Sequence, residues 1–220
     1  MFDLFQNLRD PEGGQHMLRR FRAMLSDGRH AFDLAVTAIV SGGDPAAVRE
    51  EVFETDQRIN KNEQALRREL IVHASVRGTT VFPTSLLLMS LVKDAERIGD
   101  YAKNILDLAR HESVLSEEEQ DQIAPMAAKA SDMLGRAARL FDSQDEAAAA
   151  AFLQEEHGLR HQCEAAIDKW IDDVDRNHSA ACLVTRFIKR VAGHAGNVVS
   201  SVVMPLDMLD FHPGGGGDED

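Results

Sequence analysis

The chain has 220 residues, 28% of them charged, and a formal net charge of −13. Such an acidic balance disfavours nucleic acid and anionic membrane surfaces as partners. The sequence contains no apolar run of about 18 residues, so we expect no transmembrane segment. We also expect no secretory signal and, with only Cys163 and Cys182 present, no disulfide framework, as in a reduced cytoplasmic protein.

Apolar residues recur at helical spacing along most of the chain, and aromatic residues are few. Helix-breaking and capping residues divide this pattern at Ser41-Gly-Gly-Asp-Pro45 and at Asp142-Ser-Gln-Asp145. Ser116 followed by Glu119 has the spacing of a capping box. We therefore predict six helices, over residues 16–40, 45–74, 83–110, 116–141, 146–174 and 180–209.

The segment 81–104 begins almost wholly apolar and ends in an acidic cluster. In a helix, residues four apart lie along one line. One line of this helix stays apolar throughout: Leu87, Leu91, Ile98, Ala102 and Ile105. A neighbouring line carries Glu96 and Asp100, whose mutual repulsion costs a few tenths of a kcal/mol in an isolated helix. A bound cation would reverse that cost, as would neutralisation by Arg58, Arg97 or Lys93.

The same segment has a partial copy later in the chain. Residues 186–198 repeat it 93 positions further on, with matching residues at five places. Arg97, Ile98, Ala102, Asn104 and Ile105 correspond to Arg190, Val191, Ala195, Asn197 and Val198. An internal repeat of this length indicates two units of three helices each.

The residues Asp94-Ala-Glu-Arg-Ile-Gly-Asp-Tyr-Ala-Lys-Asn-Ile105 resemble the signature D-L-E-R-I-G-D-H-A-x-N-I of the PhoU family of phosphate-uptake regulators. The resemblance implies an all-α fold of two tandem three-helix bundles related by a pseudo-twofold axis. We expect the units at 16–113 and 116–211. A short amphipathic arm at 1–15 should precede them, and a disordered Gly-rich acidic tail should follow at 212–220.

The resemblance also implies a metal site on the first unit. Relatives place a D-x-x-x-D/N pair on their second helix beside the E-x-x-x-D pair of the third, and Asp56 with Asn60 and Glu96 with Asp100 match these pairs. Four oxygen ligands suit Mg²⁺, Mn²⁺, Ca²⁺ or iron. The alternative is an acidic pocket that basic side chains balance.

The second unit departs from the family pattern. Lys189 and Gly193 stand where the E-x-x-x-D pair would be, and Glu156 and Arg160 stand at the other pair. We therefore predict a single metal site, with an ion pair between Lys189 and Glu156. We expect His194 to be a packed or surface histidine, and we expect no zinc site among the nine histidines and two cysteines.

The start of the third helix is a further departure. It reads Val81-Phe82-Pro83 where relatives often have D-L-R, so this surface is expected to make different contacts. Nothing in the sequence indicates catalytic residues or a phosphate-cradling glycine loop.

The resemblance implies a non-enzymatic, cytoplasmic and homodimeric regulator of phosphate uptake. Its partners would be the ATPase of a phosphate transporter and a membrane sensor histidine kinase. Two alternatives stay open. One is an accessory subunit of a phosphate permease, for which the arm Met1–Leu8 is the discriminating feature. The other is a metal-storing or oxygen-active helical bundle.

Overall fold

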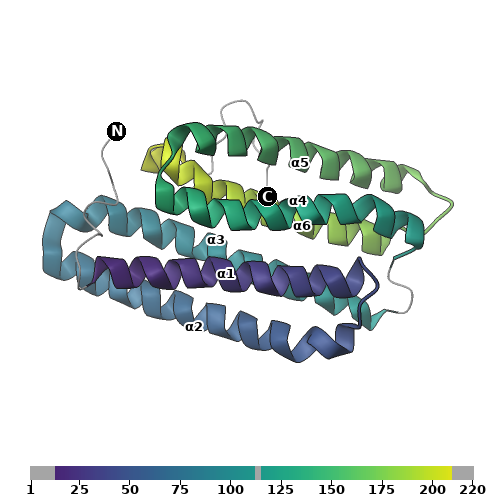
Figure 1. Cartoon of the computed structure of the whole chain (residues 1–220), viewed down its shortest axis with the longest axis horizontal. Coiled ribbons are helices and arrows are strands. Elements are labelled where there is room, and N and C mark those ends of the chain that lie inside the picture. The colour runs from purple at the N-terminus through teal and green to yellow at the C-terminus, as the bar shows by residue number, and fades with distance from the viewer. Residues whose placement is uncertain (1–12, 112–114, 210–220) are drawn as a thin grey trace.

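The computed structural model describes residues 13–111 and 115–209, and in these ranges it is all-helical. Six long helices are joined by short connections (Figure 1). Two of these connections contain a 3-10 turn, and a third 3-10 turn follows the last helix. The elements are α1 Gly14–Ile39, α2 Pro45–Arg77, η2 Gly78–Val81, α3 Phe82–Asp107, η3 Leu108–Arg110, α4 Glu117–Ser143, α5 Glu146–Asp172, α6 Ser179–Val203 and η4 Leu206–Met208. The predicted all-α class with six helices is confirmed.

The local signals read from the sequence start the helices as expected. Asp44 caps α2 by accepting from the backbone N–H of Ala46 at 2.9 Å, and Pro45 occupies the first turn. Ser116 and Glu119 form the predicted capping box at the start of α4.

Several predicted helix ends differ by a few residues, and two of them have a clear local cause. α6 ends at Val203 rather than near 209, because Pro205 has no N–H to donate and disfavours helical backbone in the residue before it. α2 continues to Arg77, three residues beyond the prediction, and stops at Gly78, whose φ of 75° lies in the left-handed region.

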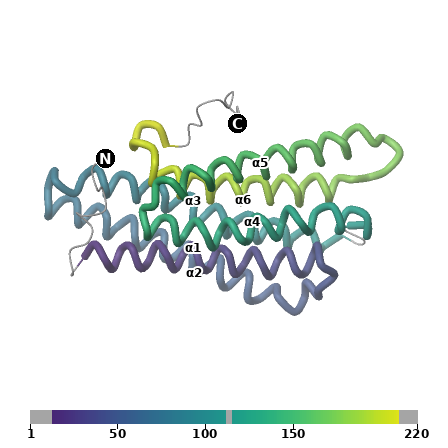
Figure 2. The backbone as a smooth tube through the Cα atoms, turned by 45° about the horizontal axis from the view of Figure 1, so that its top comes forward, coloured from purple at the N-terminus to yellow at the C-terminus, as the bar shows by residue number. Residues whose placement is uncertain are grey.

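The helices form two three-helix units that lie side by side with their long axes nearly aligned (Figures 1 and 2). α1, α2 and α3 contact one another in the first unit, and α6 contacts both α4 and α5 in the second. The units meet where α3 contacts α6 and α1 contacts α4. The α2–α3 connection and the α5–α6 connection lie at opposite ends of the molecule (Figure 1).

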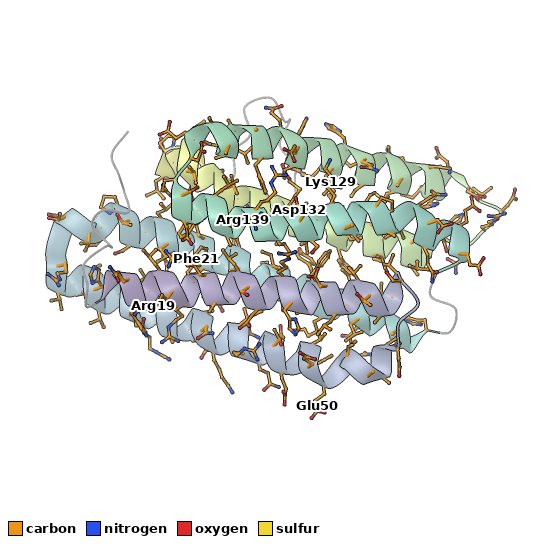
Figure 3. The ribbon with its side chains drawn as sticks, in the orientation of Figure 1. Arg19, Phe21, Glu50, Lys129, Asp132 and Arg139 are labelled. Atoms are coloured by element: carbon orange, nitrogen blue, oxygen red, sulfur yellow. The ribbon has the colours of Figure 1, made fainter. Side chains whose placement is uncertain are left out.

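The core runs through both units and across their junction. The apolar line of α3 predicted from the sequence is buried along its whole length. Phe21, on the side of α1 that faces the second unit (Figure 3), packs its ring 4.9 Å from that of Phe141 at the end of α4. Among the residues described, no helix combines the length and the apolar character that crossing a membrane requires. Residues 1–12 of the predicted arm 1–15 and the tail 212–220 lie outside the described residues, and the arm's last two residues belong to α1.

Candidate functional site

An acidic centre lies between α2 and α3, and we use this name for Asp56, Asn60, Glu96 and Asp100. α2 supplies the first pair and α3 the second. Gly99 allows the two helices to approach here, since a Cβ at this position would lie only 2.8 Å from Cδ1 of Ile59. The structure therefore brings all four predicted residues to one helix–helix contact.

The cation that occupies the acidic centre is a lysine that the sequence analysis did not single out. The ammonium of Lys103 donates to Oδ2 of Asp56 at 3.0 Å and to Oδ1 of Asp100 at 3.2 Å. Burial works against the charge on Lys103, but these two hydrogen bonds outweigh it and raise its pKa. The Asn60 side-chain amide donates to Asp56 Oδ2 at 3.3 Å, so this one oxygen accepts hydrogen bonds from both Asn60 and Lys103.

Two of the basic residues that could balance the acidic centre bind carboxylates in different places. Arg97 donates to Oδ2 of Asp100 at 3.3 Å, as predicted. Arg58 instead donates twice to Asp27 on α1, at 2.9 Å to each oxygen. Of the three basic residues that the sequence offered as alternatives, Arg97 therefore pairs with the acidic centre, whereas Arg58 pairs with α1.

Glu96 is the least stabilised carboxyl of the acidic centre. Burial raises its pKa to about 7, and the neighbouring carboxylates of Asp100 and Glu63 add to the shift. A hydrogen bond between the side chains of Glu96 and Asp100 contributes to the raised pKa, because two carboxyl groups can share a hydrogen bond only when one of them is protonated.

The fit of a metal ion to these residues is incomplete as they stand. The donors are hard oxygens of the type that Mg²⁺, Mn²⁺ or iron bind. However, Lys103 already bridges Asp56 and Asp100. Within the described ranges, no group of three or more His, Cys, Asp or Glu side chains is placed to hold a metal ion.

The corresponding place in the second unit is filled differently from our prediction. Lys189 pairs with Glu164 on α5 at 2.5 Å, and not with Glu156. Glu156 is buried, with Arg160 3.8 Å away. Its side chain packs against Gly196 of α6, where a Cβ would lie 3.2 Å from Cγ and Cδ. Gly196 is the residue 93 positions after Lys103, so a glycine replaces the bridging lysine in the second unit.

The first residue of the signature, Asp94, does not belong to the acidic centre. Its carboxylate is only 1% exposed and faces α6, where His194 Nδ1 donates to Oδ1 at 2.8 Å and Asn197 donates to the same oxygen at 2.9 Å. His194 also stacks on Tyr101, with 5.6 Å between ring centroids. His194 is therefore a packed residue, as expected, and it joins the two units.

Sequence reasoning also overlooked a histidine pair. His157 and His161 on α5 have the spacing H-x-x-x-H, and their Nε2 atoms lie 3.0 Å apart. The spacing was present in the sequence, so the signal that would have found this pair was available.

The fold and the site together define a class: a six-helix bundle of two related three-helix units with an acidic centre on the first. The family model of the PhoU domain matches residues 21–109. This range covers most of α1 and all of α2 and α3. This part of the chain is therefore similar to the PhoU domain.

Two solved structures have a similar fold. PhoU from Pseudomonas aeruginosa superposes with a TM-score of 0.76 at 18% identity, covering 86% of this chain and 94% of that one. The phosphate transport system regulatory protein PhoU from Streptococcus pneumoniae gives a TM-score of 0.71 at 18% identity, covering 91% and 97%. At this identity the likeness shows the fold alone. No curated protein sequence matches the chain.

Proposed function

We propose that this protein is a non-enzymatic regulator of phosphate uptake and phosphate signalling that acts by binding another protein. The proposal rests on the match to the PhoU domain at residues 21–109 and on the similarity in fold to the phosphate transport system regulatory protein PhoU of Streptococcus pneumoniae. The expected homodimer and cytoplasmic location belong to the same proposal.

The observation that carries the proposal is an apolar cluster within the PhoU domain. We call it the α2–α3 tip, because it surrounds the connection between these helices. Five large apolar side chains of the tip are between 49% and 77% exposed: Ile71, Val72, Val76, Phe82 and Leu86. Exposing neighbouring apolar side chains to water is unfavourable, and large clusters of them on a protein surface mark binding sites.

The chemistry of the tip selects the kind of partner. A groove between the start of α1 and the end of α2 is lined by Met17, Val72 and Val76 and by the charged side chains of Arg68, Glu69 and Arg77. Glu69 is paired with Arg20 at 3.0 Å, so the groove suits an apolar helix that carries acidic residues beside it. We assign this role to the ATPase of a phosphate transporter, with the sensor histidine kinase as the alternative partner.

The test is capture of partners from the native host grown in ample phosphate, using the tagged protein and variants of the tip. Ile71→Asp should abolish recovery of the transporter ATPase. Ile171→Asp is the matched control, because Ile171 is 64% exposed at the opposite tip and Ile71 is 60% exposed. Equal recovery with both variants would remove the tip from the proposal.

The identity of the captured protein decides between the alternatives. Recovery of the sensor kinase alone would change the partner but keep the regulatory role. Recovery of a phosphate permease alone, lost on deletion of residues 1–8, would favour the accessory-subunit alternative. Recovery of none of these three proteins would contradict a regulatory role in phosphate uptake.

Metal binding at the acidic centre stays a proposal in a narrower form. We propose that a divalent or iron ion binds Asp56, Asn60, Glu96 and Asp100 only in exchange for the Lys103 ammonium, which would move away still protonated. The bridging position of Lys103 between Asp56 and Asp100 supports this exchange. It also disfavours the metal-storing or oxygen-active alternative, which needs a centre open to a resident ion.

A further inference from the structure

A pair of histidines stands on the exposed face of α5, away from the acidic centre. His157 and His161 are one helical turn apart, and both are exposed. Their rings meet edge to face, with 4.3 Å between centroids and 86° between planes. The two Nε2 atoms lie 3.0 Å apart. Two N–H groups cannot point at each other over this distance, so at most one of these nitrogens carries a proton.

A carboxylate fixes the proton of one ring. Oε2 of Glu164 lies 3.1 Å from Nδ1 of His161. The other oxygen of Glu164 pairs with Lys189 on α6 at 2.5 Å, which holds the carboxylate in place. Glu164 therefore keeps the proton of neutral His161 on Nδ1 and leaves the lone pair of Nε2 directed at His157. A carboxylate that orients the far nitrogen of a metal-binding histidine is a common arrangement in metal sites.

The separation of the two nitrogens matches a chelate. Zinc–imidazole bonds are about 2.0–2.1 Å long, so two of them at angles between 90° and tetrahedral place their nitrogens about 2.9–3.4 Å apart. The observed 3.0 Å lies in this range. Histidines four apart on one helix face are the pairing that helical zinc motifs use.

The charges near the pair do not oppose a cation. Two basic side chains beside the pair each have a carboxylate next to them: Arg160 lies 3.8 Å from Glu156, and Lys189 pairs with Glu164. Our sequence prediction, by contrast, placed a single metal site on the first unit and none on this one.

We propose that His157 and His161 chelate one borderline divalent ion, of the Zn²⁺, Ni²⁺ or Cu²⁺ type, on the outer face of α5. Both rings would carry their protons on Nδ1 and bind the ion through Nε2. Among the described residues no third His, Cys, Asp or Glu completes the site, so water fills the other coordination positions. Imidazole ligands prefer these ions over Mg²⁺ or Mn²⁺, which the oxygen donors of the acidic centre would prefer.

The test is calorimetric titration of the untagged full chain with Cu²⁺, the divalent ion of this series that nitrogen ligands bind most tightly. The wild type should bind one equivalent of Cu²⁺ at the histidine pair. His161→Ala and His157→Ala should each weaken binding by at least about tenfold, because the second ligand of a chelate acts at a high effective concentration. Glu164→Gln keeps both ligands and should still weaken binding by about tenfold through loss of orientation.

His30→Ala is the matched control, since His30 is also an exposed helix histidine beside a glutamate, Glu51, but has no histidine one turn away. It should bind Cu²⁺ as the wild type does. Equal binding by His161→Ala and the wild type would overturn the proposal and leave a histidine–histidine hydrogen bond only. Binding that Asp56→Ala or excess Mn²⁺ removes would place the ion in the acidic centre and overturn it as well.

Discussion

Asp94 and His194 are 100 positions apart and hydrogen-bond at 2.8 Å across the junction of the two three-helix units. The repeat offset of 93 positions relates Asp94 to Phe187 and Tyr101 to His194. The rings of Tyr101 and Phe187 are themselves in contact, with 5.7 Å between centroids. The same contact between repeats is thus made once by an ionisable pair and once by two aromatic rings.

This relationship predicts strong coupling between Asp94 and His194. Oδ2 of Asp94 is buried and accepts no hydrogen bond from the described residues, so the carboxylate depends on the donors at Oδ1. Asp94→Ala or His194→Ala alone should lower the free energy of unfolding by about 3 kcal/mol. Urea denaturation of both single variants and the double variant should give a coupling energy of about 1–3 kcal/mol. Additive effects would mean that the pair contributes no specific contact.

Lys103 should act as the internal counter-ion of the acidic centre. Lys103→Ala leaves Asp56 and Asp100 without their shared donor, so its free energy of unfolding in chelator should fall by about 1–3 kcal/mol. Mn²⁺ should then raise its melting temperature more than that of the wild type, because no ammonium competes with the ion. Differential scanning calorimetry with and without Mn²⁺ measures both effects.

Lys93→Ala is the control for that experiment, because Lys93 is an exposed lysine of the same helix. Its melting temperature should match that of the wild type in both buffers. If Mn²⁺ shifts the wild type and Lys103→Ala equally, Lys103 does not compete for the ion. If it shifts neither, the acidic centre does not bind Mn²⁺.

Two glycines inside long helices should respond oppositely to alanine. At Gly28 on α1, a Cβ would lie 2.9 Å from Cγ2 of buried Ile98, a branched side chain with little freedom to move. At Gly158 on α5, no atom lies within 4 Å of the added Cβ. Both variants gain helix propensity, so Gly158→Ala should stabilise by about 0.5–1 kcal/mol. In urea denaturation, the free energy of unfolding of Gly28→Ala should be about 1–3 kcal/mol lower than that of Gly158→Ala. Equal free energies of unfolding would show that α1 and α3 can move apart without cost.

A pH-dependent contact ties the start of α4 to the start of α6. His178 has a carboxylate at each ring nitrogen: Asp173 at 3.0 Å from Nε2 and Glu119 at 2.7 Å from Nδ1. These hydrogen bonds raise the pKa of His178 above its ordinary 6.5. Burial opposes ionisation of Glu119, but hydrogen bonds from His178 and Ser116 outweigh it and lower its pKa below 4.5.

The directions of these two pKa shifts determine the pH range in which the contact between His178 and Glu119 stabilises the fold. A raised histidine pKa stabilises the fold fully below 6.5, and this contribution is lost as the pH rises through the folded-state pKa. A lowered glutamate pKa stabilises above 4.5, and that contribution is lost as the pH falls through the folded-state pKa. His178→Gln should therefore reduce stability more at pH 5.5 than at pH 9 in urea denaturation. His111 is an exposed histidine outside the helices, so the control variant His111→Gln should have the stability of the wild type at both pH values. An equal loss of stability from His178→Gln at pH 5.5 and pH 9 would contradict the charged contact.

The helices themselves were predictable from short stretches of sequence. Asp44 with Pro45 and Ser116 with Glu119 determine helix starts through contacts within one turn, so no knowledge of the rest of the chain is needed. The apolar line from Leu87 to Ile105 predicted the buried face of α3 for the same reason, since periodicity is a property of one helix. The repeat offset of 93 positions indicated the two-unit arrangement.

The partners of charged side chains were decided only by the tertiary structure. Lys103 is 47 positions from Asp56, and His194 is 100 positions from Asp94, so neither contact leaves a local pattern in the sequence. Lys189 was assigned to the wrong carboxylate for the same reason, and the contact of Arg58 with Asp27 was not foreseen. By itself the sequence determined which residues of each helix are buried and which carry charge. Which charges meet depends on how closely and at what register the helices pack, and that is a property of the assembled core.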